Sequence, residues 1–216
     1  MANLITVARV VLLFITVAFI YLGWPGNGQA GDALILLIAT FLTLIVFLGD
    51  AFDGMIARAR GEADDLGAVV DIAGDRIVEN VYWVVFAHLG LVSVWFPLLQ
   101  IARSFTVDTM RSLALAEGKT AFGEKTMMQS RFGTWLASSR LHRALYGAAK
   151  VVTFIWFLLQ TALTVQVTRY PDWAQNFGNA LGIIQAIGLT LAVFTILYSL
   201  LRGAVVVWDS RHYLLK

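Results

Sequence analysis

Long apolar runs separated by short polar connections dominate the pattern along the chain. A helix needs roughly 20 residues to cross about 30 Å of hydrocarbon, and apolar runs of about that length recur throughout the sequence. We expect membrane-spanning helices at about 5–24, 32–57, 67–93, 95–116, 146–168 and 179–206. The predicted fold class is all-α: a multi-pass integral membrane bundle of six transmembrane helices, forming a single domain over residues 1–216.

The first apolar run has a second interpretation. Arg9, the apolar stretch 10–22 and the small residues near Ala30 resemble a secretory signal. Every later run is also typical of a membrane span, so a first transmembrane helix is the simpler interpretation.

The composition agrees with a membrane protein, because 59% of the residues are hydrophobic and only 14% are charged. The chain has no cysteine, which excludes thiolate catalysis and cysteine-ligated metals. A formal net charge of +2 is too small to indicate nucleic-acid binding, and we expect no nucleic-acid partner.

The placement of the basic residues predicts the orientation. Lysine and arginine concentrate at 58–60, at 119–143 and at the C-terminus, whereas the connections at 24–31 and 168–179 carry almost none. By the positive-inside rule, both termini, the connection at 58–66 and a loop at about 117–145 face the cytoplasm. The expected location is the plasma membrane.

Acidic residues gather in one stretch, from Gly49 to Arg76, which holds seven of the 14 in the chain. Asp50 and Asp53 are three residues apart and share one face of a helix, as do Asp71 and Asp75, four apart on the next helix. A short turn joins the two helices, so they run antiparallel and four carboxylates converge. Three further acids, Glu62, Asp64 and Asp65, are expected to be solvated charges of the turn.

Four converging carboxylates repel one another and are costly to hold near a membrane. A divalent cation or a pair of them would offset this cost. All-oxygen ligation favours Mg²⁺, with Mn²⁺ or Ca²⁺ as substitutes, and such ions favour phosphate-bearing ligands. Small residues on the same faces leave space for a bulky ligand or for close helix packing.

These residues form a known pattern. The spacing Asp50-x2-Asp53-Gly54-x2-Ala57-Arg58-x8-Gly67-x3-Asp71-x3-Asp75 resembles the signature of the CDP-alcohol phosphotransferase family, with every fixed position present. The resemblance implies a six-helix membrane enzyme, commonly a homodimer, with a cytoplasm-facing active site. It also implies transfer of a phosphatidyl or similar group from a CDP-linked lipid donor to an alcohol, with release of CMP.

The resemblance assigns roles to the residues of this motif. It implies that two metal ions, Mg²⁺ or Mn²⁺, are held by Asp50, Asp53, Asp71 and Asp75. It implies that Asp75 is also the general base that deprotonates the acceptor hydroxyl. The implied CDP-binding residues are Asp50, Gly54, Ala57, Arg58, Gly67 and Asp71.

Other segments bear on the acceptor. "NLITVAR", with Thr6 and Arg9, and "ARSFTVDTMR", with Arg103 and Arg111, resemble phosphatidylglycerophosphate synthases within the family, and Lys150 matches a basic position near their acceptor site. These five residues are the candidate acceptor-binding set. The resemblance therefore implies a donor such as CDP-diacylglycerol or CDP-archaeol and glycerol 3-phosphate as acceptor, with inositol phosphate, inositol or serine as alternatives.

Simpler interpretations remain beside these assignments. Arg111 lies three residues after Asp108 and can pair with it. Glu79 continues the acidic stripe and can either touch the acceptor or hold an arginine. A divalent-cation transporter is the alternative of another class, since its ligands would also be intramembrane acids. Confinement of the acids to two neighbouring helices at one membrane face favours the enzyme.

Overall fold

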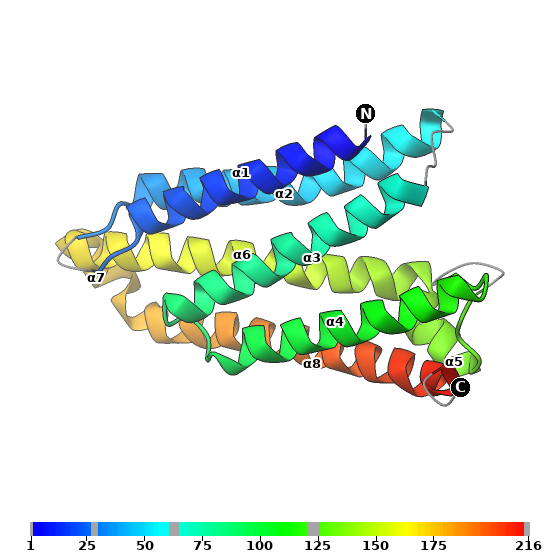
Figure 1. Ribbon diagram of the computed structural model, residues 1–216. Coiled ribbons are helices and arrows are strands. Elements are labelled where there is room, and N and C mark those ends of the chain that lie inside the picture. Colours follow the sequence, from blue (N-terminus) through cyan, green and yellow to red (C-terminus); the bar gives the residue numbers. More distant parts are fainter. Residues whose placement is uncertain (1, 27–29, 61–64, 121–125, 214–216) are drawn as a thin grey trace. The chain divides into compact units, whose positions relative to one another are not determined.

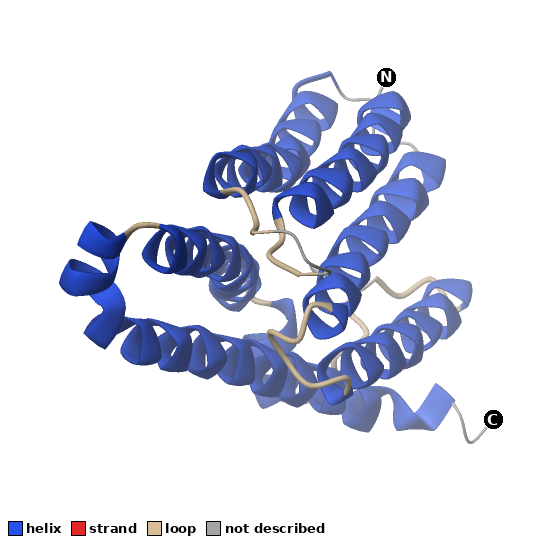
Figure 2. Cartoon of the chain, turned by 90° about the vertical axis from the view of Figure 1, so that its left-hand side faces the viewer, coloured by secondary structure: helices blue, strands red, loops and turns tan. Residues whose placement is uncertain are grey.

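The computed structural model describes residues 2–26, 30–60, 65–120 and 126–213, with side chains except at 2–4, 50–60 and 65–69. Every regular element in these ranges is a helix (Figure 2), and the pairing of Thr120 with Thr126 is an isolated bridge. The all-α prediction is confirmed.

Each predicted span coincides with a long helix (Figure 1). The six are α1 (Ala2–Gly23), α2 (Ala33–Arg60), α3 (Asp65–His88), α4 (Trp95–Ala116), α6 (Arg140–Arg169) and α8 (Leu181–Ser210). Between them lie α5 (Arg131–Gly133), the π-helix η1 (Thr134–Ser138), α7 (Pro171–Phe177) and the 3₁₀ turn η2 (Gly178–Ala180). The main difference is that α6 begins at Arg140 rather than 146, so the loop after α4 is shorter than predicted.

The described helices include membrane-length apolar segments. Three of them, at Ile5–Gly23, Arg140–Arg169 and Pro171–Tyr213, are long and apolar enough to cross a membrane by length and composition, and Ala33–Gly49 is a shorter apolar helix. These segments indicate a membrane protein. The count of six spans stays a prediction.

The chain divides into two compact units, each with its own packing. Unit 1 comprises Met1–Leu91 and Val151–Thr190, and unit 2 comprises Val92–Lys150 and Leu191–Lys216. In unit 1, α1 packs against α2 and α3. An aromatic core joins α3 to α6, where the Phe154 ring lies 5.1 Å from that of Tyr82 and 5.4 Å from that of Phe86. The Tyr82 hydroxyl donates to Thr43 of α2 at 2.9 Å, so the buried phenol is satisfied.

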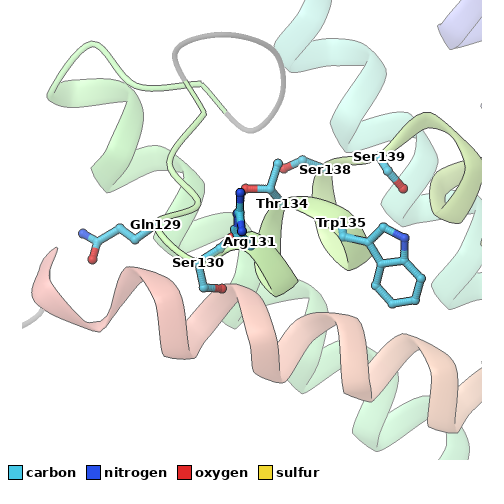
Figure 3. A pocket seen from close by; sticks show the side chains of 7 residues that line it. All are labelled: Gln129, Ser130, Arg131, Thr134, Trp135, Ser138 and Ser139. Atoms are coloured by element: carbon cyan, nitrogen blue, oxygen red, sulfur yellow. The ribbon is translucent and has the colours of Figure 1, made fainter.

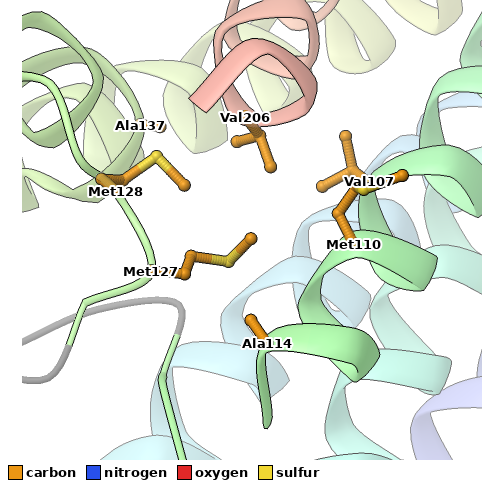
Figure 4. Packing of buried hydrophobic residues seen from close by; sticks show 7 residues of the cluster. All are labelled: Val107, Met110, Ala114, Met127, Met128, Ala137 and Val206. Carbon is orange, nitrogen blue, oxygen red and sulfur yellow. The ribbon is translucent and has the colours of Figure 1, made fainter. Parts of the chain in front are cut away.

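In unit 2 the loop after α4 is held by its own apolar side chains. Met127 and Met128 are buried among Val107, Met110, Ala114, Ala137 and Val206 (Figure 4). Flexible thioether side chains fill such irregular spaces well. Met127 and Met128 therefore belong to the core of unit 2, although they lie in a loop.

Candidate active site

The acidic motif has two halves, one on α2 and one on α3, and the structure describes the acidic side chains of the second half only. Residues 50–60 continue α2, so the helical spacing predicted for Asp50 and Asp53 holds for the backbone. The side chains of Asp50, Asp53, Gly54, Ala57, Arg58 and Gly67 lie outside the described set. Asp71 and Asp75 are described, and both lie on α3.

Arg9 of α1 binds the described half of the motif. Its Nη2 donates to Oδ1 of Asp75 at 2.6 Å, and its Nη1 lies 3.8 Å from Oδ1 of Asp71. The arginine side chain is 4% exposed, whereas the two carboxylates are 41% and 47% exposed. A nearly buried guanidinium thus anchors two carboxylates whose other sides stay accessible.

Two glycines allow α1 to come this close. A Cβ at Gly49 of α2 would lie 3.0 Å from Cδ of Arg9, and a Cβ at Gly74 of α3 would lie 2.5 Å from Cγ2 of Thr6. Real Cβ atoms do not tolerate the second distance, so only glycine fits there without displacement. Gly49 directly precedes Asp50. Arg9 therefore packs on α2 next to the point where the motif begins, and it pairs with Asp75 of the motif on α3.

The donor set fits a hard divalent cation. Asp71 and Asp75 offer accessible carboxylate oxygens on one helix face, and the guanidinium beside them shows that this face attracts positive charge. Asp50 and Asp53 would complete the oxygen ligands. Among the side chains that the structure describes, no group of three or more His, Cys, Asp or Glu could hold a metal; two of the four predicted ligands lie outside that set.

Two other predicted residues form local ion pairs. Glu79, buried in unit 1, accepts from Nη1 of Arg76 at 3.2 Å, so it does hold an arginine. Arg111 of α4 donates to Oδ1 of Asp108 at 3.2 Å, the pairing that its spacing allows. Neither contact tests the acceptor assignment of Arg111.

A closed ring of hydrogen bonds lies in the core of unit 2. Gln100 of α4 donates to the hydroxyl of Tyr146 at 3.2 Å, Tyr146 donates to Oγ of Ser199 at 2.9 Å, and Ser199 donates back to Oε1 of Gln100 at 2.8 Å. All three residues are buried. Each member gives one hydrogen bond and takes one, so the ring is satisfied and fixes the orientation of the Tyr146 side chain.

Three cations converge on that tyrosine. Nζ of Lys150 lies 4.8 Å from the centre of the Tyr146 ring, and the guanidinium carbons of Arg202 and Arg103 lie 5.4 Å and 5.9 Å from it. A cation–π contact is worth about 1–2 kcal/mol, while neighbouring like charges oppose one another. We call Arg103, Lys150 and Arg202 the basic cluster. Its charge and geometry suit an anion with several oxygens, such as a phosphate.

The two arginines of the basic cluster are fixed by the backbone. Arg103 donates through Nε to the carbonyl of Ser199 at 3.3 Å and packs on Gly203, where a Cβ would lie 2.7 Å from its Cγ. Arg202 donates through Nε and Nη2 to the carbonyls of Leu136 and Ala137 at 3.2 Å and 3.0 Å. Arg202 therefore also ties the loop segment η1 to α8.

A cavity of about 460 Å³ lies in the same loop. Figure 3 shows the side chains that line it: Gln129, Ser130, Arg131, Thr134, Trp135, Ser138 and Ser139. Ser130 donates to Oδ2 of Asp209 through both its hydroxyl, at 2.8 Å, and its backbone N–H, at 3.1 Å. The loop contains the helical pieces α5 and η1, and Asp209 and Arg202 hold them in place.

The structure brings together some of the predicted residues and adds others. Thr6, Arg9, Asp71 and Asp75 lie together in unit 1, and Arg103 and Lys150 lie together in unit 2. The prediction missed Arg202, Tyr146 and the ring that holds it. Arg202 had a usable signal, because an arginine inside the apolar run 179–206 is an intramembrane charge.

Comparisons with known proteins agree with the motif. A family model described as CDP-alcohol phosphatidyltransferase matches residues 1–197. Two relatives, both named "Probable phosphatidylglycerophosphate synthase", come from Mycobacterium tuberculosis strains CDC 1551 / Oshkosh and ATCC 25618 / H37Rv, and each is 28% identical over 118 residues. The alignment covers 55% of this chain and 54% of each relative, so the chain spans about half the length of the curated relatives it matches.

Proposed function

The chain belongs to the CDP-alcohol phosphatidyltransferase family, and we propose that it transfers a phosphatidyl group from CDP-diacylglycerol, or from a CDP-archaeol analogue, to glycerol 3-phosphate. CMP is the second product. The family membership and the names of the relatives support a role in phospholipid biosynthesis.

The basic cluster is the observation that carries the choice of acceptor. Three cations around one fixed ring favour a ligand that brings its own phosphate. Glycerol 3-phosphate and inositol phosphate have this chemistry, whereas free inositol and serine lack a phosphate. The names of the two relatives favour glycerol 3-phosphate of the pair.

The carboxylates serve the reacting atoms. The acceptor hydroxyl oxygen forms a bond to the β-phosphorus of the donor, the bond from that phosphorus to the bridging oxygen breaks, and CMP leaves with the electron pair. Asp75 takes the hydroxyl proton, and Arg9 holds the Asp75 carboxylate in place through its 2.6 Å contact. Mg²⁺ or Mn²⁺, held by Asp50, Asp53, Asp71 and Asp75, would bind the diphosphate and stabilise its developing charge.

The remaining assignments follow from the same family. Gly54, Ala57, Arg58 and Gly67 would line the CDP pocket with Asp50 and Asp71, and Thr6 and Arg111 stay candidate acceptor residues. We place the motif and both termini at the cytoplasmic face of the plasma membrane, and we propose a homodimer.

The acceptor assignment is tested by removing one cation of the basic cluster. Lys150→Met keeps an unbranched apolar side chain against Tyr146 and removes the charge. Loss of one charge-assisted hydrogen bond, about 1.5–3 kcal/mol, corresponds to a KM for glycerol 3-phosphate that is about 10- to 100-fold higher. The KM for CDP-diacylglycerol should not change, and the matched variant Lys119→Met, at an exposed loop residue, should behave as wild type. An unchanged KM for glycerol 3-phosphate would refute the assignment.

The metal assignment has a readout that does not depend on turnover. Mn²⁺ binding to the purified protein, followed by electron paramagnetic resonance, should weaken at least tenfold in Asp71→Asn and stay unchanged in Asp172→Asn, at an exposed residue of α7. Equal Mn²⁺ binding by both variants would remove Asp71 from the ligand set. Mn²⁺ uptake into proteoliposomes without any CMP release would indicate the cation transporter instead.

A further inference from the structure

The helical segment formed by α5 and η1 presents one face to its surroundings. Arg131, Thr134, Trp135 and Ser138 follow the spacing i, i+3, i+4, i+7 and share this face, which we call the loop face. All four line the cavity of about 460 Å³ described above (Figure 3). Arg131 and Thr134 are exposed, and Trp135 is 56% exposed. The cavity is therefore open to a ligand that arrives from outside the protein.

The segment is fixed to α8 at two places. Arg202 donates to the carbonyls of Leu136 and Ala137 at 3.2 Å and 3.0 Å. The hydroxyl of Ser130 donates to Asp209 at 2.8 Å. Arg202 and Asp209 are separated by about 10 Å along the helix, at a rise of 1.5 Å per residue. The segment therefore runs beside the last turns of α8.

These two contacts give the level of the loop face along α8. Arg131 directly follows the residue that binds Asp209, so its backbone lies near the end of α8. Trp135 directly precedes a residue that binds Arg202, so it lies about 10 Å further from that end. The charge of the loop face is thus nearest the end of the helix, and its aromatic ring lies deeper along it.

The same part of α8 has the features of a membrane boundary. The helix belongs to the segment Pro171–Tyr213, which is long and apolar enough to cross a membrane. Exposed apolar side chains recur along one of its faces, at Phe194, Leu197, Leu201 and Trp208. Beyond the last of them, the guanidinium carbon of Arg211 lies 4.5 Å from the centre of the Trp208 ring. Tryptophan and arginine are typical of the layer where hydrocarbon meets water. The level of Trp208 therefore indicates the interface, and the level of Leu201 indicates the hydrocarbon.

A continuous set of ring contacts joins the loop face to this apolar face of α8. The ring centre of Trp135 lies 4.2 Å from that of His142, and Nδ1 of His142 is hydrogen-bonded to the Tyr198 hydroxyl at 2.5 Å. The Tyr198 ring stacks on that of Phe194 at 5.7 Å. The ring of Phe132, which is also exposed, lies 6.0 Å from that of Trp135. The aromatic side chains of the loop therefore border the side of α8 that faces lipid.

The polar side chains at the cavity suit an anion. The guanidinium of Arg131 has no ion pair or hydrogen bond with any residue that the structure describes. Ser139, which also lines the cavity, accepts from the N–H of His142 at 3.3 Å, so its own proton stays available to donate. No acidic residue is among the described residues of the lining. Arginine and hydroxyl donors are groups that bind phosphate oxygens, and the level of Arg131 is that of the interface, where the phosphates of phospholipids lie.

We propose that the loop face binds the phosphate of an anionic phospholipid, which Arg131 holds at the membrane interface while Phe132 and Trp135 insert beside the glycerol and the acyl chains. The rings that border the apolar face of α8 favour a lipid over a soluble phosphate. Binding forms and breaks no covalent bond. The site does not depend on the phosphotransferase reaction, so its failure would leave the proposed function untouched.

The absence of cysteine allows the proposal to be tested at a single labelled position. Phe132→Cys carries an NBD fluorophore, and the full chain is reconstituted into phosphatidylcholine vesicles. Phosphatidylcholine or phosphatidylglycerol with a doxyl quencher high on one acyl chain is then added in steps. Both lipids should quench the label, and phosphatidylglycerol should reach half-quenching at about a fivefold lower mole fraction, the effect of one basic residue near an anionic headgroup. Lys119→Cys, labelled in the same way at an exposed loop residue, is the control and should be quenched by neither lipid.

Substitutions of the arginine identify the group that recognises the headgroup. Arg131→Gln, made in the labelled protein, should bring the two lipids to half-quenching at the same mole fraction. Arg131→Lys keeps the charge and should restore most of the preference. Arg169→Gln, at an exposed arginine of α6, is the matched control and should keep the fivefold preference. Melting temperatures followed by tryptophan fluorescence establish that each variant is folded.

Four results would overturn the proposal. If neither lipid quenches the label at position 132, the segment does not lie in the membrane interface. Equal quenching by the two lipids before Arg131 is changed would remove the recognition of charge, and a fivefold preference kept by a folded Arg131→Gln would remove the role of that residue. Loss of the preference on addition of inorganic phosphate, with the ionic strength matched by chloride, would make a soluble phosphate the ligand instead of a lipid.

Discussion

The ring of hydrogen bonds around Tyr146 allows a sharp test of how unit 2 is held together. Tyr146→Phe removes one hydroxyl and keeps the aromatic ring that the basic cluster surrounds. Gln100 then loses the acceptor at 3.2 Å, and Ser199 loses the donor at 2.9 Å. The hydrogen bond from Ser199 to Gln100 remains.

The expected cost follows from these two lost bonds. Side-chain hydrogen bonds between membrane helices are worth about 0.6 kcal/mol on average and up to about 1.7 kcal/mol. Because all three members of the ring are buried and water has little access to Gln100 and Ser199, we expect about 2 kcal/mol in total. For a chain of this size that is a fall in Tm of about 4–8 °C.

The seven tryptophans provide the assay, since their fluorescence reports unfolding of the purified protein in detergent. Tyr170→Phe, at an exposed tyrosine, is the matched control and should melt as wild type does. If Tyr146→Phe melts within about 1 °C of the wild type, the ring does not stabilise the unit. A large rise in the KM for the acceptor with unchanged Tm would also contradict the account, because the cation–π surface is kept.

Two further predictions concern the packing of α1 on α3 in unit 1 and the loop of unit 2. Gly74→Ala should lower Tm by several degrees, because its Cβ would lie 2.5 Å from Cγ2 of Thr6. The control Gly147→Ala has open space around it and should raise Tm slightly, through a gain in helix propensity of about 1 kcal/mol. Equal effects of the two variants on Tm would refute the close packing of α1 on α3. Asp209→Ala removes the carboxylate that accepts from the hydroxyl and the N–H of Ser130. Limited trypsin digestion should therefore cleave the loop several-fold faster than in the wild type. An unchanged cleavage rate would show that this contact does not hold the loop.

Much of the architecture could be predicted from the lengths of the apolar runs. Apolar runs of membrane length set the positions of the long helices, because each run must bury its backbone polar groups in a helix. The start of α6 was predicted too late, since "RLHRALYG" mixes basic and apolar residues and does not read as a membrane span. Mean hydropathy does not detect an amphipathic stretch that extends a helix beyond its apolar segment.

The site could be predicted only where its residues are close in sequence. Asp71 and Asp75 share a face through local helical spacing. The pairing of Arg9 with Asp75 joins residues 66 positions apart, and the convergence of Lys150 and Arg202 on Tyr146 joins two different helices. Such contacts depend on which helices pack together, which hydropathy does not specify.

The most direct measurement is CMP release by the purified protein with CDP-diacylglycerol, Mg²⁺ and glycerol 3-phosphate. The account predicts CMP in equal amount to phosphatidylglycerophosphate, identified by mass spectrometry, and at least a hundredfold loss of turnover in Asp75→Asn with its fold intact. Full turnover by Asp75→Asn would contradict the assignment of the base. No CMP from the wild type with glycerol 3-phosphate, inositol phosphate, inositol or serine would contradict the proposed reaction itself.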